Sequence, residues 1–117
     1  MAKPVSSHAI AEKVVTDLDA IIRNKPKELH EPLTDAIRPL LRVRERMIYA
    51  FREGPTPGTR AQLDDLNALV SLAYGAEYPQ VGVDWEKIQD TRDELRKFLE
   101  KYPVLAEAEE KRSLPEF

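Results

Sequence analysis

Residues 84–102 read DWEKIQDTRDELRKFLEKY, and they carry the clearest helical pattern of the chain. Mostly apolar residues recur there at alternating spacings of three and four, and this spacing places them on one face of a helix. The stripe is apolar apart from one arginine, and it consists of Trp85, Ile88, Arg92, Leu95, Leu99 and Tyr102. Asp84 can cap the first turn, and Pro103 cannot continue the helix. The pattern predicts an amphipathic helix whose apolar face must be covered by other helices.

The same periodicity appears in three earlier segments, at residues 7–24, 32–53 and 59–77. Each has an apolar stripe of helical spacing that is expected to face a shared core. The main stripe residues are Ile10, Val14, Leu18, Ile21 and Ile22 in the first segment, Leu33, Ile37, Leu40, Met47 and Phe51 in the second, and Leu63, Leu66, Leu69, Val70 and Ala73 in the third.

Residues of the right type stand at the ends of these segments. Ser6 or Ser7 can cap the first helix. Thr59 and Gln62 have the spacing of a capping box, which predicts that the third helix begins at Thr59. Gly54 is followed by a proline, and this pair is a strong stop for the second helix.

Pro39 lies inside the second segment rather than at its edge. Its ring removes one backbone donor and crowds the carbonyl of Asp35, so we expect a kink at this point. The alternative is a helix that starts near Pro39 with a separate turn before it. Arg38 is a poor N-cap residue, which favours the kink.

These segments predict an all-α fold, an antiparallel four-helix bundle that occupies residues 1–103. The chain has 117 residues, enough for one domain with a core of its own. No segment has the alternating pattern of a β-strand. Residues 104–117 form a C-terminal tail, with either a short fifth helix at 104–112 or a frayed end.

Composition excludes several classes of chemistry. There are no cysteines, so disulfides, thiolate metal sites, iron–sulfur clusters and a cysteine nucleophile are ruled out, and a reducing cytoplasm fits best. No apolar run approaches the ~20 residues needed to span a bilayer, so no membrane association is expected. The net charge of −3 argues against wholesale nucleic-acid binding.

Motifs for catalysis or cofactor binding are missing as well. His8 and His30 are the two histidines, and neither follows the Glu-x-x-His spacing of di-iron bundles. Neither belongs to a recognisable Ser-His-Asp set, and the glycines near residue 54 lack the remaining parts of a phosphate-binding loop. Glu28, His30, Glu31 and Asp35 cluster in one linker and could hold an adventitious ion. We expect no catalytic residue, no metal and no cofactor.

Two surface features are candidates for binding. Arg38, Arg42 and Arg46 are four residues apart and should line one face of a helix, where like charges repel unless an acidic counterpart is near. That counterpart is internal, a partner protein or phosphate. Tyr78 and Trp85, with Tyr74 nearby, flank the last interhelical loop and are of the types that anchor interfaces. The alternative is that Trp85 plugs the end of the bundle while Val81 and Val83 cover it.

Charged residues on the apolar seams suggest a different site. Asp17, Arg44 and Arg92 interrupt the stripes of their segments. They pair inside the bundle and shape a polar pocket, or they lie at its margin with their charged ends in water.

The function that the sequence favours is a small, non-catalytic, cytoplasmic protein-interaction or regulatory module with anchors at Arg38, Arg42, Arg46, Tyr78 and Trp85. Its partner is another protein, or a second copy in a homodimer. The first alternative is a small-ligand or enzymatic pocket around the charged seam residues. The second is a nucleic-acid-associated factor that uses the arginine row.

Overall fold

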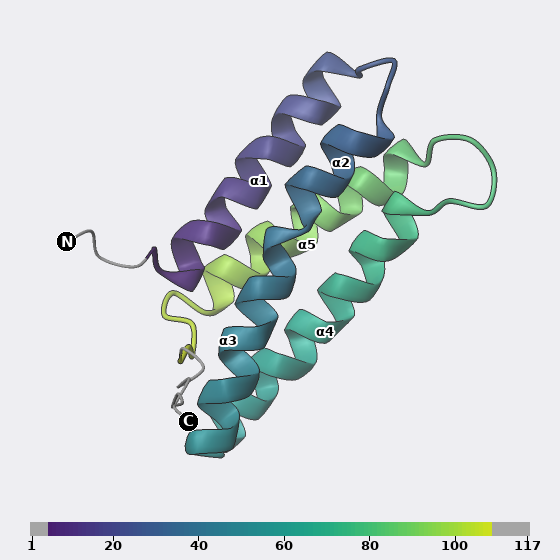
Figure 1. Cartoon of the computed structure of the whole chain (residues 1–117). Helices are drawn as coiled ribbons and strands as arrows, with labels where there is room; N and C mark the ends of the chain where they lie inside the picture. Colours follow the sequence, from purple (N-terminus) through teal and green to yellow (C-terminus); the bar gives the residue numbers. More distant parts are fainter. Residues whose placement is uncertain (1–4, 109–117) are drawn as a thin grey trace, which may run out of the picture.

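The computed structural model describes residues 5–108, and Figure 1 shows their arrangement. These residues form helices and no strand, so the predicted all-α class is confirmed. The helices are α1 (Ser7–Asn24), α2 (His30–Ile37), α3 (Pro39–Glu53), α4 (Pro57–Glu77) and α5 (Trp85–Lys101).

The helices pack as an antiparallel bundle. α1 packs against α3 and α5, α4 packs against the same two helices, and the backbones of the diagonal pairs, α1 with α4 and α3 with α5, stay further apart. α2 continues the path of α3 and packs against α1 and α4, so α2 and α3 together form the second rod of the bundle. Within residues 5–108, no helix is both long and apolar enough to cross a bilayer.

In α1 and α5, the first turn is capped by a side chain that the sequence predicts for this role. α1 spans the predicted residues, and the side chain of Ser6 caps it by accepting a hydrogen bond from the backbone N–H of Ala9 at 3.1 Å. Lys25 ends α1 in the left-handed conformation, with φ at 43°. Asp84 caps α5 as predicted, accepting a hydrogen bond from the N–H of Lys87 at 3.0 Å.

The predicted start of α4 is wrong. The helix begins at Pro57, and the hydroxyl of Thr56 is the cap, accepting a hydrogen bond from the N–H of Thr59 at 3.0 Å. Pro57 suits this first position because its missing N–H would have no helical acceptor there. Gln62 is therefore not part of a capping box, and its amide contacts the C-terminal part of the chain instead.

Pro39 divides the second segment into α2 and α3. Arg38 between them keeps right-handed helical dihedral angles, with φ at −49° and ψ at −40°, so the chain bends here without forming a loop. The N–H of Leu41 bonds the carbonyl of Arg38 at 3.0 Å, which is a tighter turn than that of an α-helix. The expected kink is present, although it is sharp enough to separate two helices.

The core is built from the predicted stripes. Leu40, Leu66 and Leu95 come from different rods of the bundle and are at most 1% exposed. In α5 the buried face is rotated from the predicted seam: Thr91 and Phe98 are buried, whereas Arg92 lies at the margin. The hydroxyl of Thr91 donates to the carbonyl of Lys87 at 2.8 Å, which satisfies a polar group that helix packing places in the core.

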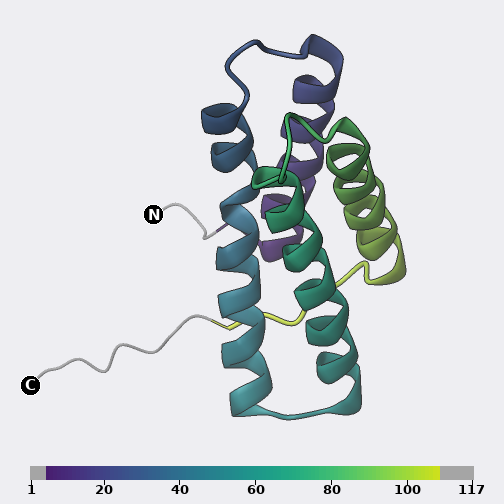
Figure 2. The same ribbon diagram turned by 90° about the vertical axis from the view of Figure 1, so that its right-hand side faces the viewer.

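Residues 103–108 are not helical. The part of the expected short helix that the structure describes, residues 104–108, runs across the bundle instead, and the rest of that prediction and of the tail lies outside the described residues. Leu105 belongs to the hydrophobic core. Figure 2 shows that the α3–α4 hairpin extends beyond the ends of α1 and α5, and that this C-terminal segment crosses it.

Candidate functional site

A groove lies where α2 meets α3 and α4 packs beside them, with a cavity volume of about 160 Å³. Much of one wall comes from the residues on either side of Pro39, because the bend there separates the ends of α2 and α3. The lining residues are Thr34, Ile37, Arg38, Leu40 and Leu41 on that wall, and Val70, Tyr74, Glu77 and Tyr78 on the wall formed by α4 and its C-cap.

The groove gathers apolar side chains that the bundle does not bury. Leu41 is 38% exposed, Tyr74 is 41% exposed and Tyr78 is 62% exposed. Val70, Tyr74 and Tyr78 are four residues apart, so helical geometry lines them up along one face of α4. These side chains form an exposed apolar and aromatic strip along the groove.

Polar groups at one end of the groove are bonded to one another. Glu77 is only 7% exposed, and its carboxylate accepts a hydrogen bond from the hydroxyl of Thr34 across the groove. The same carboxylate raises the pKa of Tyr78 above its ordinary value, through a hydrogen bond and through its charge. The Tyr78 phenol therefore stays neutral at physiological pH, and because its one O–H is bonded to Glu77, its oxygen is left to accept a hydrogen bond from a bound partner.

The aromatic strip continues onto α2. The ring of His30 lies 5.8 Å from that of Tyr78, measured between centroids, and the two rings are tilted by 58°. His30 is the first residue of α2, so this contact holds the tyrosine beside the loop that enters that helix.

The structure separates the predicted arginine row. Arg38 lines the groove and is exposed, and Arg42 is exposed one turn further along the chain. Arg46 is only 4% exposed and pairs with Glu107 at 3.0 Å, so its prediction as a surface anchor is wrong. The acidic counterpart of Arg46 is thus internal, but it comes from the C-terminal segment rather than from α4 or α5.

Trp85 lies outside the groove. Its ring is half-buried and packs against the core at the start of α5. The ammonium of Lys25, at the end of α1, lies 5.4 Å from the ring centroid. This contact ties two adjacent helix ends together, so Trp85 has a structural partner that Tyr78 does not share.

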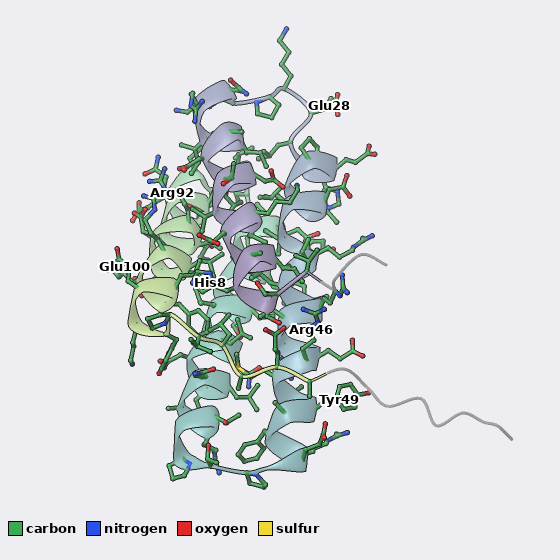
Figure 3. All side chains as sticks on the ribbon, turned by 90° about the vertical axis from the view of Figure 1, so that its left-hand side faces the viewer. His8, Glu28, Arg46, Tyr49, Arg92 and Glu100 are labelled. Atoms are coloured by element: carbon green, nitrogen blue, oxygen red, sulfur yellow. The ribbon has the colours of Figure 1, made fainter. Side chains whose placement is uncertain are left out.

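The polar pocket expected around three seam residues does not form. Asp17 pairs with Lys13 of its own helix at 2.8 Å. The Nε of Arg44 donates to the side-chain oxygen of Asn67 at 2.6 Å. Arg92 binds Asp19 and Asp93 at 2.8 and 2.9 Å at the margin of α5, where Figure 3 labels it. Each residue has a different partner, so the three do not converge.

A larger hollow lies between α4 and α5, and charged side chains at its rim are paired with one another. The space between α4 and α5 has a cavity volume of about 460 Å³. At its rim, Lys101 binds Asp65 at 3.0 Å and Lys97 binds Glu94 at 3.1 Å. A hydrogen bond from the hydroxyl of Tyr102, together with Lys101, lowers the pKa of Asp65. These pairs fix the surface of the bundle.

Within the described part of the chain, no three or more histidine, cysteine, aspartate or glutamate side chains come together as a metal site. The linker cluster of Glu28, His30, Glu31 and Asp35 is therefore not assembled around an ion-sized centre.

The sequence places Tyr74 beside the candidate surface of Tyr78 and Trp85, but it does not indicate Leu41 or Glu77. The spacing of Val70, Tyr74 and Tyr78 was the available signal for the aromatic strip. No comparable signal exists for Leu41 and Glu77, because the first depends on the bend at Pro39 and the second on the approach of Thr34.

The groove is thus assigned from its geometry. A comparison with known proteins finds no matching family model, no match among curated proteins and no match among solved structures.

Proposed function

We propose that this protein is a non-catalytic, cytoplasmic protein-interaction module. Its groove beside Pro39 binds an apolar segment of a partner protein that also carries an acidic residue. One observation carries the proposal: Leu41, Tyr74 and Tyr78 are exposed, and all three line the same groove as Arg38. Tyrosine and arginine are the residue types that most often contribute large binding energies at interfaces.

The size of the groove favours a protein partner over a small molecule. Its cavity volume is about 160 Å³, whereas small-molecule sites usually measure roughly 300–1,000 Å³. A space of this size holds one or two side chains. An amphipathic partner helix that inserts one apolar residue between two helices needs a space of this size.

The positive charge beside the groove indicates that the partner carries an acidic residue. Arg38 lines the groove, Arg42 follows one turn later, and both are exposed. An acidic residue beside the inserted apolar one would pair with these guanidinium groups. Such pairs at an interface rim act mainly on the association rate, so binding should weaken as salt rises.

The hydrogen bonds of the groove support a non-catalytic role. Glu77 already accepts the hydroxyl hydrogen bond of Thr34, and its hydrogen bond and charge raise the pKa of Tyr78 away from neutrality. Tyr78 is therefore poorly suited to general acid–base catalysis, which needs a group that titrates near the working pH. A chain without cysteines also suits a reducing compartment such as the cytoplasm.

Affinity capture from the native host tests this proposal. The bait is the wild-type chain, and the variants are Tyr74→Ala/Tyr78→Ala in the groove and Val81→Ala/Val83→Ala as a matched control. Val81 and Val83 are exposed apolar residues that do not line the groove. We expect a partner that is retained by the control and lost by the groove variant.

Direct binding then defines the contact. With the captured protein purified, Arg38→Glu should weaken binding at least tenfold, since it places a like charge beside the partner's carboxylate. Equal capture by all three baits would overturn the proposal. Light scattering decides whether the partner is a second copy, because the monomer has a mass of 13.4 kDa.

A further inference from the structure

The C-terminal segment, residues 103–108, packs against the surface of the bundle and is hydrogen-bonded to three of its helices. After α5 ends, the segment runs across α3 and α4, and Figure 3 shows it passing close to the labelled Arg46. Its contacts come from residues that are far apart in the sequence and belong to different helices. Those residues are Ser7 of α1, Arg46 of α3 and Gln62 of α4.

The main chain of the segment is recognised by hydrogen bonds. The amide of Gln62 donates to the carbonyl of Val104 at 3.2 Å and accepts from the N–H of Ala106 at 2.8 Å. These two bonds flank Leu105, and within the segment they involve only backbone atoms. Two residues later, the N–H of Ala108 donates to the carbonyl of Arg46 at 3.0 Å. An extended peptide with other side chains could make the same three bonds.

Two side chains of the segment supply its specificity. Leu105 is 4% exposed and packs in the hydrophobic core, whereas its neighbour Val104 is 80% exposed. Glu107 provides a carboxylate oxygen, Oε1, that accepts hydrogen bonds from the N–H of Ser7, from the hydroxyl of Ser7 and from Nη1 of Arg46. Each of these three distances is 3.0 Å.

The site formed by Arg46 and Ser7 around the Glu107 carboxylate favours an anionic group. Arg46 is 4% exposed, and its Nη1 also donates to the carbonyl of Val5 at 2.7 Å. A guanidinium held this deeply needs a carboxylate beside it, because an uncompensated buried charge is strongly unfavourable. The N–H of Ser7 at the start of α1 adds positive potential at the same point. Any ligand that replaces Glu107 must therefore bring a carboxylate.

We infer that the surface formed by Ser7, Arg46 and Gln62 is a binding site for an extended peptide with an aliphatic residue two positions before a glutamate. Residues 104–108 of the chain occupy this site as an intramolecular ligand, and a partner segment with the same pattern displaces them. The site is separate from the groove beside Pro39, since no residue is shared between them. The covalent link gives the internal ligand a high effective concentration, so the partner must bind tightly to compete.

The test uses the full chain with a weakened internal ligand, Leu105→Ser/Glu107→Gln. The probe is a fluorescent peptide with the sequence of residues 102–108, YPVLAEA, blocked at both ends. We expect saturable binding to this variant that is at least tenfold tighter than to the wild-type chain. A control peptide with glutamine in place of its glutamate should bind the variant at least tenfold more weakly. Circular dichroism checks that the variant is folded.

A second variant covers the case in which the first does not fold. Glu107→Gln alone keeps Leu105 in the core and changes a side chain that is 36% exposed. It should bind the probe several-fold more tightly than wild type, and adding Gln62→Ala should abolish that gain. If a folded variant shows no binding, or if variant and wild type bind equally, the segment is only a structural strap and the inference fails.

Discussion

Arg46 shows how a single residue links the end of the chain to its beginning. Its guanidinium is nearly buried, yet it donates to the carbonyl of Val5, the hydroxyl of Ser7 and the carboxylate of Glu107. A buried charge is tolerated when such partners replace the water it has lost. Arg46 therefore acts as an internal connector between the N-terminal and C-terminal parts of the described chain.

Removing the carboxylate partner of Arg46 should destabilise the fold. We expect Glu107→Ala to lower the free energy of unfolding by about 1–3 kcal/mol, the range for leaving a buried charged donor without its acceptor. Urea unfolding monitored by circular dichroism measures this change. Glu100→Ala is a suitable control because Glu100 is exposed on α5, and it should have an effect within about 0.5 kcal/mol. Equal midpoints for both variants would contradict this account of Arg46.

Asp65 makes the stability of the α4–α5 surface depend on acid pH. The hydroxyl of Tyr102 donates to Asp65 at 2.7 Å, and this bond, followed by that from Lys101, lowers the pKa of Asp65 below its ordinary value of 3.8. A lowered pKa in the folded state means that the stabilisation is fully present above pH 3.8 and is lost as the pH falls through the folded value.

The variant Tyr102→Phe tests that dependence. Without the hydroxyl, the pKa of Asp65 should move up toward its ordinary value, and the acid loss of stability should become shallower. Carboxyl NMR signals followed during an acid titration report the pKa directly. Tyr78→Phe removes a hydroxyl far from Asp65 and should leave the titration unchanged. An unshifted Asp65 in Tyr102→Phe would show that the hydrogen bond has no influence.

At the scale of elements, Pro39 determines how the second rod of the bundle is divided. Arg38 keeps helical dihedral angles even though a residue before proline normally avoids them. Ile37 and Leu40, on either side of the bend, are 5% and 1% exposed. Their burial holds both helices against the core and leaves the groove open between the bend and α4.

Replacing Pro39 with alanine should join α2 and α3. The new N–H would face the carbonyl of Asp35, because the dihedral angles of Arg38 are already helical. We expect stability to rise by about 2–3 kcal/mol, since an interior proline costs ~3 kcal/mol and its rigidity returns up to ~1 kcal/mol through the unfolded state. Hydrogen exchange should show a protected amide at position 39. Rapid exchange at that amide would mean that the bend is set by packing rather than by proline.

At the scale of the whole molecule, the fold depends on one shared core. The long α3–α4 hairpin reaches past α1 and α5, and the C-terminal segment fills part of the difference by placing Leu105 in the core. Several charged pairs between rods lie at the surface or its margin, such as those of Asp19 of α1 with Arg92 and Arg96. Pairs near the surface contribute little, so apolar packing must supply most of the stability.

Truncation of a central core residue tests this dependence. Leu66 is 0% exposed, and Leu66→Ala should lower the free energy of unfolding by about 2–5 kcal/mol through lost burial and the cavity left behind. Val81 is 89% exposed, so Val81→Ala should change stability by less than about 0.5 kcal/mol. Thermal and urea unfolding of both variants give the comparison. Similar losses in the two variants would show that the helices are not stabilised by a common core.

Local signals in the sequence were sufficient for the helices and for most of their ends. The stripes of Leu18 and Leu66 identified the buried faces of their helices, and Asp84 identified the start of α5, because periodicity and capping involve only nearby residues. Thr56 was missed as a cap because Thr59 with Gln62 matches a capping box, whereas Thr56 has no glutamate or glutamine three residues later. Only Gln62's long-range contact with the C-terminal segment shows that its side chain has a different role.

The amino-acid pattern by itself thus determined that this chain forms amphipathic helices that bury a common apolar face, since a helical period can be read from neighbouring residues. Tertiary structure alone decided which polar side chains meet. The burial of Arg46, the meeting of Arg38 with Tyr78 in one groove, and the docking of Glu107 onto Ser7 depend on helix rotation and on contacts between residues distant in the chain. No local periodicity encodes those contacts, because each is created only when the rods pack against one another.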